Sequence, residues 1–183
     1  MPPFPSWLGW GRRREIAAVL KARIVKLPSP NFTLQPKGHR VSMIVLHATV
    51  GGFASAVDWL RKGDRDDRTS AHYVVAKDGG VVQLVDENDA SWHAGFGKWK
   101  GDGKINNRSI GIELENANDG EDAYPIEQLE STMWLCVRCC RSDSIAPEDV
   151  VGHCHVDPKR KTDPVGFPWE DFRASLKRHL KQG

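Results

Sequence analysis

The sequence predicts an α/β fold in which a mixed central β-sheet is flanked by helices in a single domain. Its 183 residues suit one domain with one sizeable core. Short apolar, β-branched segments alternate along the chain with amphipathic helical segments, a pattern typical of helices packed on a mixed sheet. An apolar content of 39% and a charged content of 27% are ordinary for a soluble protein, and no apolar stretch approaches the length of a membrane span.

The N-terminal part of the chain differs from the rest in charge. Residues 1–40 carry eight Lys or Arg residues against the single acid Glu15, whereas the remainder carries eighteen basic and twenty-three acidic residues. We expect a basic helix over 6–26 and an extended Pro-rich connector over 26–40, which together form a 1–40 segment ahead of a main domain over 41–183. The basic segment is expected either to contact an anionic wall or membrane surface or to be a solvated helix face.

Two further expectations follow from the same region and from composition. The first residues contain Arg12 to Arg14, but no apolar segment with a small-residue cleavage site follows. We therefore expect synthesis in a cytoplasm without a signal peptide. No nucleic-acid-binding motif is present and the main domain is net acidic, so no nucleic-acid partner is expected.

The first half of the main domain contains four predicted strands, two of them in a hairpin, and one helix. An apolar run over 42–49 predicts a buried strand ending near His47, and 53–63 predicts a short helix. A hairpin is expected over 70–87, turning at the Asp78–Gly79 pair. A Gly- and Trp-rich loop over 91–108 is of the kind that carries function, and 109–116 reads as another strand.

The second half contains two predicted helices. One begins at Pro125 and presents an apolar face; the other covers 168–183, and a short strand or turn over 148–153 lies between them. The four cysteines do not have the spacing of a structural zinc site and are expected to pack as small apolar residues, with a disulfide from Cys139 or Cys140 as the alternative. The cysteines are Cys136, Cys139, Cys140 and Cys154.

Residues with metal-binding chemistry occur at the predicted strand ends. His47 ends one strand, His153 follows "DVVG" in the same way, and Asp163 comes ten residues later. Two histidines and a carboxylate, with a fourth position open to water, form a standard catalytic zinc set, and these donors favour zinc over copper or an iron–sulfur cluster. Within "GHCHVDPKRKTDP", His155 remains an alternative to His153 and Asp157 an alternative to Asp163.

Hydrolysis at such a centre also needs a proton acceptor and a partner for the oxyanion. Glu113 and Glu115 lie two apart on a predicted strand and so share a face; the spacing does not choose between them. Lys161 lies two residues before Asp163, close enough to reach the same site.

Six segments in this order resemble the zinc-dependent N-acetylmuramoyl-L-alanine amidases, a family that includes phage endolysins, a cytosolic amidase that recycles anhydro-muropeptides, and the peptidoglycan-recognition proteins. The segments are "MIVLHAT", "SAHYVV", "DGGVVQLVDE", "SWHAG", "NNRSIGIELEN" and "GHCHVDPKRKTDP". The resemblance covers about Ser42 to Leu180. It implies one Zn²⁺ per chain and assigns each matching residue a role: His47, His153 and Asp163 as zinc ligands, Glu113 as general base and then acid, Lys161 as oxyanion partner, and Trp92 and His93 as walls of the substrate groove.

The chain departs from some members of the family at two positions that bear on its function. Its third implied ligand is an aspartate rather than a cysteine, and Ala71 stands where some phage enzymes have a catalytic tyrosine, which leaves His72 as a supporting or packing residue. We expect a monomeric amidase that cleaves the bond between the lactyl group of N-acetylmuramic acid and L-alanine of the peptidoglycan stem. The basic, Trp-containing N-terminal segment favours an endolysin acting on the cell wall; the alternatives are a cytosolic anhydro-muropeptide recycling amidase and a non-catalytic peptidoglycan-binding module.

Overall fold

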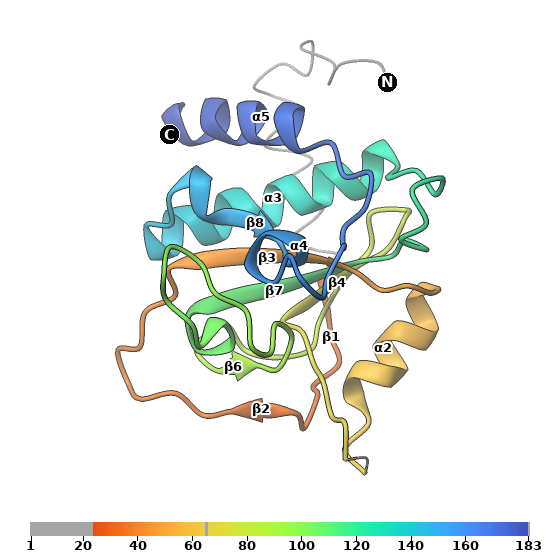
Figure 1. Cartoon of the computed structure of the whole chain (residues 1–183), viewed down its shortest axis with the longest axis vertical. Coiled ribbons are helices and arrows are strands. Elements are labelled where there is room, and N and C mark those ends of the chain that lie inside the picture. Colours follow the sequence, from red (N-terminus) through yellow and green to blue (C-terminus); the bar gives the residue numbers. More distant parts are fainter. Residues whose placement is uncertain (1–23, 65, 183) are drawn as a thin grey trace.

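The computed structural model describes residues 24–64 and 66–182, and its centre is a six-stranded sheet with the order β1-β5-β4-β7-β3-β8 (Figure 1). The strands are β1 (Ile24–Lys26), β3 (Met43–Ala48), β4 (Tyr73–Val75), β5 (Val81–Gln83), β7 (Ser109–Leu114) and β8 (Val150–Gly152). Strands β4, β7, β3 and β8 run parallel to one another, whereas β5 runs antiparallel to β4. The mixed sheet that the sequence predicts is therefore confirmed.

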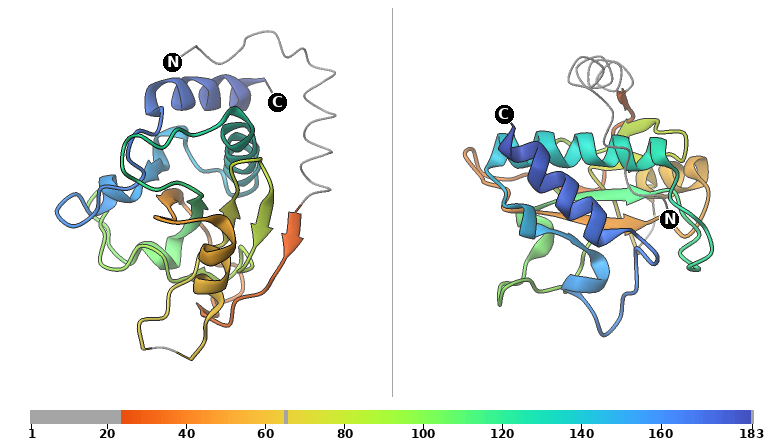
Figure 2. Two further views of the ribbon diagram at one scale, coloured as in Figure 1. Left: turned by 90° about the vertical axis from the view of Figure 1, so that its right-hand side faces the viewer. Right: turned by 90° about the horizontal axis from the view of Figure 1, so that it is seen from above.

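Helices cover both faces of this sheet. Helices α3 (Ile126–Asp143) and α5 (Trp169–Lys181) lie over one face, as the view from above shows (Figure 2). Helix α2 (Phe53–Arg61), the small sheet of β2 (Phe32–Thr33) and β6 (Ala90–Ser91), and the 3-10 helix η1 (Ile105–Arg108) lie on the other side (Figure 1). The chemistry-bearing loops therefore gather on the side opposite α3 and α5.

Alternation along the central strands divides their side chains between the two faces. In β3, Ile44 and Leu46 pack into the main core with α3 and α5, while Met43 and Val45 pack into a second cluster beneath the 94–105 loop. Because successive strand residues point to opposite faces, His47 shares the second face with Val45. The core thus holds β3 rigidly and presents one histidine, at its carboxyl end, on the side of the loops.

Several element predictions are confirmed and three need correction. The strand at 42–49, the helix at 53–63 and the hairpin are present as β3, α2 and the β4–β5 pair. Ile24–Lys26 form β1, paired parallel with β5, rather than the end of a helix; the rest of the expected basic helix lies outside the described residues. Pro125 is extended and precedes α3 rather than opening it, and a one-turn helix, α4 (His153–Val156), follows β8 where no helix was expected.

All four cysteines are free, and the prediction that they pack as buried residues is confirmed for three of them, whereas Cys154 is only partly buried. Cys136, Cys139 and Cys140 are buried on α3 against the sheet. None of the described helices has the length and apolar character needed to cross a membrane.

Candidate metal centre

The candidate site forms where the ends of parallel strands meet. His47 of β3 and Glu113 of β7 are direct register partners, so both side chains project from the same face of the sheet. On the other flank of β3, β8 ends at Gly152 and delivers His153 to the same edge. The loop after α4 then brings Asp163 back, with the Cys154 backbone N–H donating to its carbonyl at 2.8 Å.

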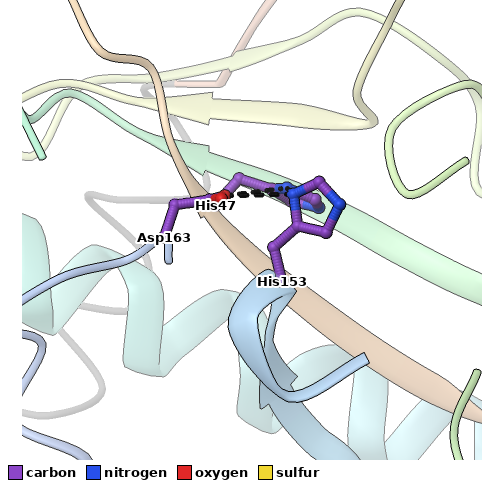
Figure 3. Close-up of side chains that lie close together, drawn as sticks. All are labelled: His47, His153 and Asp163. Carbon is purple, nitrogen blue, oxygen red and sulfur yellow. Dashed lines mark hydrogen bonds and ion pairs between the residues drawn. The ribbon is translucent and has the colours of Figure 1, made fainter. Parts of the chain in front are cut away.

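Three donor atoms converge at this edge (Figure 3). The Nδ1 atoms of His47 and His153 lie 3.0 Å apart, and Asp163 Oδ2 lies 3.2 Å from His153 Nδ1 and 3.3 Å from His47 Nδ1. The edges of a zinc tetrahedron with bonds of about 2.0 Å are about 3.3 Å, so the triangle has the size that a zinc ion requires. Within the part of the chain that the structure describes, these residues make the one His/Cys/Asp/Glu cluster of this kind.

The charge states of the cluster suit a cation. Burial lowers the pKa of His47 to about 4, and His153 adds to this effect, so the imidazole is neutral at neutral pH. Burial raises the pKa of the Asp163 carboxyl, but its contacts with the His153 and His47 ring nitrogens outweigh this effect and hold that pKa well below its usual range. A carboxylate beside the ring nitrogens of two buried histidines is a ligand set for a divalent metal ion.

Glu113 stands beside the cluster as a carboxyl group able to exchange protons. Its Oε2 atom is buried and has no hydrogen-bond partner among the described residues. The pKa of Glu113 is raised to about 8, first by burial and then by the negative charge of Asp163, while Lys161 acts in the opposite direction. A bound cation would lower this pKa toward neutrality, the range in which a general base and acid is most effective.

A groove of about 530 Å³ opens over the cluster and Glu113. Helix α2 forms one wall with Ser55, Ala56 and Trp59, while Trp92 and the exposed Lys161 belong to other parts of the lining. The Trp92 indole N–H donates to Thr33 Oγ1 at 2.9 Å, and the Arg68 guanidinium lies over its ring. The structure therefore places Trp92 and Lys161 at the groove, where the sequence expected them.

The rival ligands are engaged elsewhere. His155 Nδ1 accepts a hydrogen bond from the Gly152 backbone N–H at 2.8 Å, and its ring packs edge-on against Trp169. Asp157 forms an ion pair with Arg160. The structure thus brings His153 and Asp163, rather than His155 and Asp157, to His47.

The rival glutamate also has a structural task. Glu115 accepts hydrogen bonds from the backbone N–H groups of Phe53 and Lys77, at 3.0 and 2.9 Å, and so ties the start of α2 to the end of β4. Of the two glutamates, Glu113 lines the groove.

His93 lies at the groove, as the sequence expected, and it also contacts His47 and Ser109. Its Nδ1 atom is 2.9 Å from His47 Nε2, and its Nε2 atom is 3.0 Å from Ser109 Oγ. Burial lowers the pKa of His93 well below its ordinary value, so the ring is neutral. The sequence reasoning missed Ser109 and Gly111; the available signal was the two small residues at alternate positions of "SIGIE", on the same face as Glu113.

Two buried histidines, an aspartate and a buried glutamate at one groove of a mixed sheet form the donor set and proton acceptor that a metal-dependent hydrolase would use. Residues 37–166 match the N-acetylmuramoyl-L-alanine amidase family. The chain belongs to this family, and it is an N-acetylmuramoyl-L-alanine amidase, which confirms the resemblance noted in the sequence and argues against a non-catalytic binding module.

Relatives and solved structures agree with this assignment. The 1,6-anhydro-N-acetylmuramyl-L-alanine amidase AmpD of Haemophilus influenzae is 33% identical over 173 residues, which span 83% of this chain and 91% of the relative. A crystal structure of an AmpD selenomethionine derivative has a TM-score of 0.74 at 28% identity, covering 84% of this chain and 94% of the other. The Escherichia coli amidase AmiD was solved with the substrate anhydro-N-acetylmuramic acid-L-Ala-D-gamma-Glu-L-Lys. It has a TM-score of 0.68 at 31% identity, and the match covers 78% of this chain and 60% of AmiD. An endolysin amidase of Clostridium intestinale shares the fold at 25% identity.

Proposed function

We propose that this chain is a zinc amidase that releases the stem peptide from soluble 1,6-anhydro-muropeptides, cutting between the lactyl carbonyl of anhydro-N-acetylmuramic acid and L-alanine. The observation that carries the chemistry is the 3.0–3.3 Å triangle of His47, His153 and Asp163 beside the buried carboxyl of Glu113. The choice of substrate is supported by the relatives, whose names and bound ligand specify the anhydro sugar. This proposal reverses the preference for an endolysin in the sequence reasoning and takes up its alternative.

The residues of this chain divide the reaction between them. His47, His153 and Asp163 would hold the zinc ion, which supplies a Lewis acid that polarises a carbonyl and acidifies water. Glu113 takes a proton from the attacking water and returns it to the nitrogen of L-alanine as the amide bond breaks. The Lys161 ammonium stabilises the oxyanion that develops on the carbonyl oxygen of the lactyl group. Trp92 and the wall formed by α2 flank the substrate and limit access of bulk water.

The division of the chain remains part of this proposal. We assign catalysis to residues 41–183, with 24–33 attached to that body because β1 pairs with β5 and β2 with β6. Every residue assigned to the site comes from one chain, so a monomer suffices, and sedimentation velocity on the zinc-loaded protein tests this.

The competing endolysin function rests on the excess of basic residues over 1–40. A direct comparison separates the two: turnover of purified anhydro-muropeptide and dye release from stained sacculi, each for the full chain and for a chain that begins at Ile24. The truncation keeps β1 and therefore the whole six-stranded sheet. The recycling function predicts fast turnover of the soluble substrate by both forms. Efficient release from sacculi by the full chain, lost on truncation, would support the endolysin instead.

A further inference from the structure

We propose that His93 is a positioning residue, which fixes the tautomer and orientation of His47 through a hydrogen-bond chain that ends on the backbone carbonyl of Ile105. This inference rests on the proposed metal role of His47. It assigns to His93 a task other than binding substrate and gives Ser109, which is buried on β7, a share in the metal site.

The donor and acceptor order in this hydrogen-bond chain follows from its last acceptor, the Ile105 carbonyl. Ser109 Oγ lies 2.6 Å from the Ile105 carbonyl oxygen, which can only accept, so the serine hydroxyl donates there. With its proton used, Ser109 Oγ accepts from His93 Nε2 at 3.0 Å, and His93 therefore carries its proton on Nε2. The bare Nδ1 atom of His93 then accepts from His47 Nε2–H at 2.9 Å.

The consequence for His47 is a single tautomer. With the proton on Nε2, its Nδ1 lone pair points at His153 Nδ1 and Asp163 Oδ2, the other two donors of the triangle. Hydrogen bonds to the distal nitrogen of a metal-binding histidine fix its ring and raise its basicity. His153 has no such bond, because its Nε2 atom lacks a partner among the described residues. His47 is thus the histidine of the pair whose orientation is held by hydrogen bonds at its distal nitrogen.

The fold reserves space for this arrangement. A Cβ atom added to Gly111 would lie 2.5 Å from Cγ of His93, so the ring occupies the volume of the missing side chain on β7. The backbone on either side of the ring is held by Asn106, whose Oδ1 accepts from the N–H groups of His93 and Ala94 at 3.2 and 2.7 Å.

A role in substrate hydrogen bonding does not fit the same geometry. Both ring nitrogens of His93 are used, one by His47 and the other by Ser109. Although the ring lies at the groove, it has neither an N–H donor nor a lone pair left for a ligand.

The test measures zinc affinity in the absence of substrate. We compare wild type with His93→Ala, His93→Asn and Ser109→Ala by competition with a chromogenic chelator. The matched control is Ser131→Ala, because Ser131 is also buried and also donates to a backbone carbonyl, that of Gly79 at 2.7 Å, on the opposite face of the sheet. Thermal unfolding in chelator identifies variants that fail to fold.

The expected result is a loss of zinc affinity of about 10- to 100-fold for His93→Ala, the usual effect of removing such a partner. Ser109→Ala shifts the affinity in the same direction although it lies one step further from His47, and Ser131→Ala leaves it unchanged. His93→Asn retains more affinity than His93→Ala because its amide oxygen can replace Nδ1 as acceptor. Nitrogen-15 NMR of the metal-free protein should show His47 protonated on Nε2.

Three outcomes would overturn the inference. Wild-type zinc affinity in His93→Ala, with a raised KM alone, would make His93 a substrate contact. A folded Ser109→Ala variant with the same zinc affinity as Ser131→Ala would contradict the proposed series of hydrogen bonds. So would a His47 ring protonated on Nδ1. If wild type itself binds no zinc, the proposed function fails as well, which separates that failure from the others.

Discussion

His72 provides a prediction whose size can be worked out from the structure. The ring is fully buried, and its Nδ1 atom accepts from the Gly111 backbone N–H at 2.9 Å, while Nε2 donates to the Asp89 carbonyl at 3.0 Å. Ser91 Oγ also lies 2.8 Å from Nδ1. Protonation would set a second N–H against that of Gly111, and burial lowers the pKa of His72 to about 4. The ring therefore stays neutral while the protein is folded.

The stability of the fold should consequently fall in acid. The unfolded chain binds a proton on His72 near pH 6.5, whereas the folded protein binds it only near pH 4. The contribution of neutral His72 to the free energy of unfolding is therefore complete above pH 6.5 and is lost as the pH falls toward 4. The full shift corresponds to about 3 kcal/mol of unfolding free energy, of which about 2 kcal/mol is lost between pH 7 and pH 5. The variant His72→Asn lacks the titrating group and keeps an acceptor near the position of Nδ1.

Urea unfolding of wild type and His72→Asn at pH 7 and pH 5, both in chelator, measures this difference. His47 and His93 titrate in both proteins. The change in unfolding free energy of the variant, subtracted from that of the wild type, therefore isolates the effect of His72. We expect the wild type to lose about 2 kcal/mol more than the variant. Parallel losses in the two proteins would show that His72 is not held neutral and would refute the reasoning.

Three further predictions concern the site. Lys161→Ala should keep a full zinc equivalent while losing about 100- to 1000-fold in turnover; a near wild-type rate would remove Lys161 from the mechanism. His47→Ala should purify without zinc, because two donors of the triangle remain, and a full equivalent by elemental analysis would refute the ligand set. Cys154→Ser should keep both zinc and activity, since Cys154 lies outside the donor cluster; loss of zinc there would point to thiolate ligation.

Much of the fold could be predicted because its elements carry local signals. An apolar run predicts the buried strand β3, and turn residues predict the hairpin at Asp78–Gly79; both are present. The strand β1 could not be predicted in this way. Its three residues are helical in pattern but pair with β5 through the backbone, a tertiary contact that overrides local preference.

The site could be predicted as a set of residue types but not as a geometry. Spacing alone left His155, Asp157 and Glu115 as alternatives, because the chain direction after β8 depends on the one-turn helix α4 and on the return of the loop to Cys154. The hydrogen-bond chain through His93 and Ser109 joins residues sixteen apart across a loop and a strand. Such a contact leaves no periodicity in the sequence; its visible trace is the pair of small residues on β7, Ser109 and Gly111, and Gly111 lies beneath the ring.

The most direct test of the central claim is mass spectrometry of the products that the purified protein forms from anhydro-N-acetylmuramyl peptide. With one zinc per chain, we expect free peptide beginning with L-alanine together with released anhydro-N-acetylmuramic acid, no products after chelation, and recovery when Zn²⁺ is restored. Cleavage within the peptide or the sugar with the lactyl–alanine bond intact, or an undiminished rate in the chelated protein, would contradict the account.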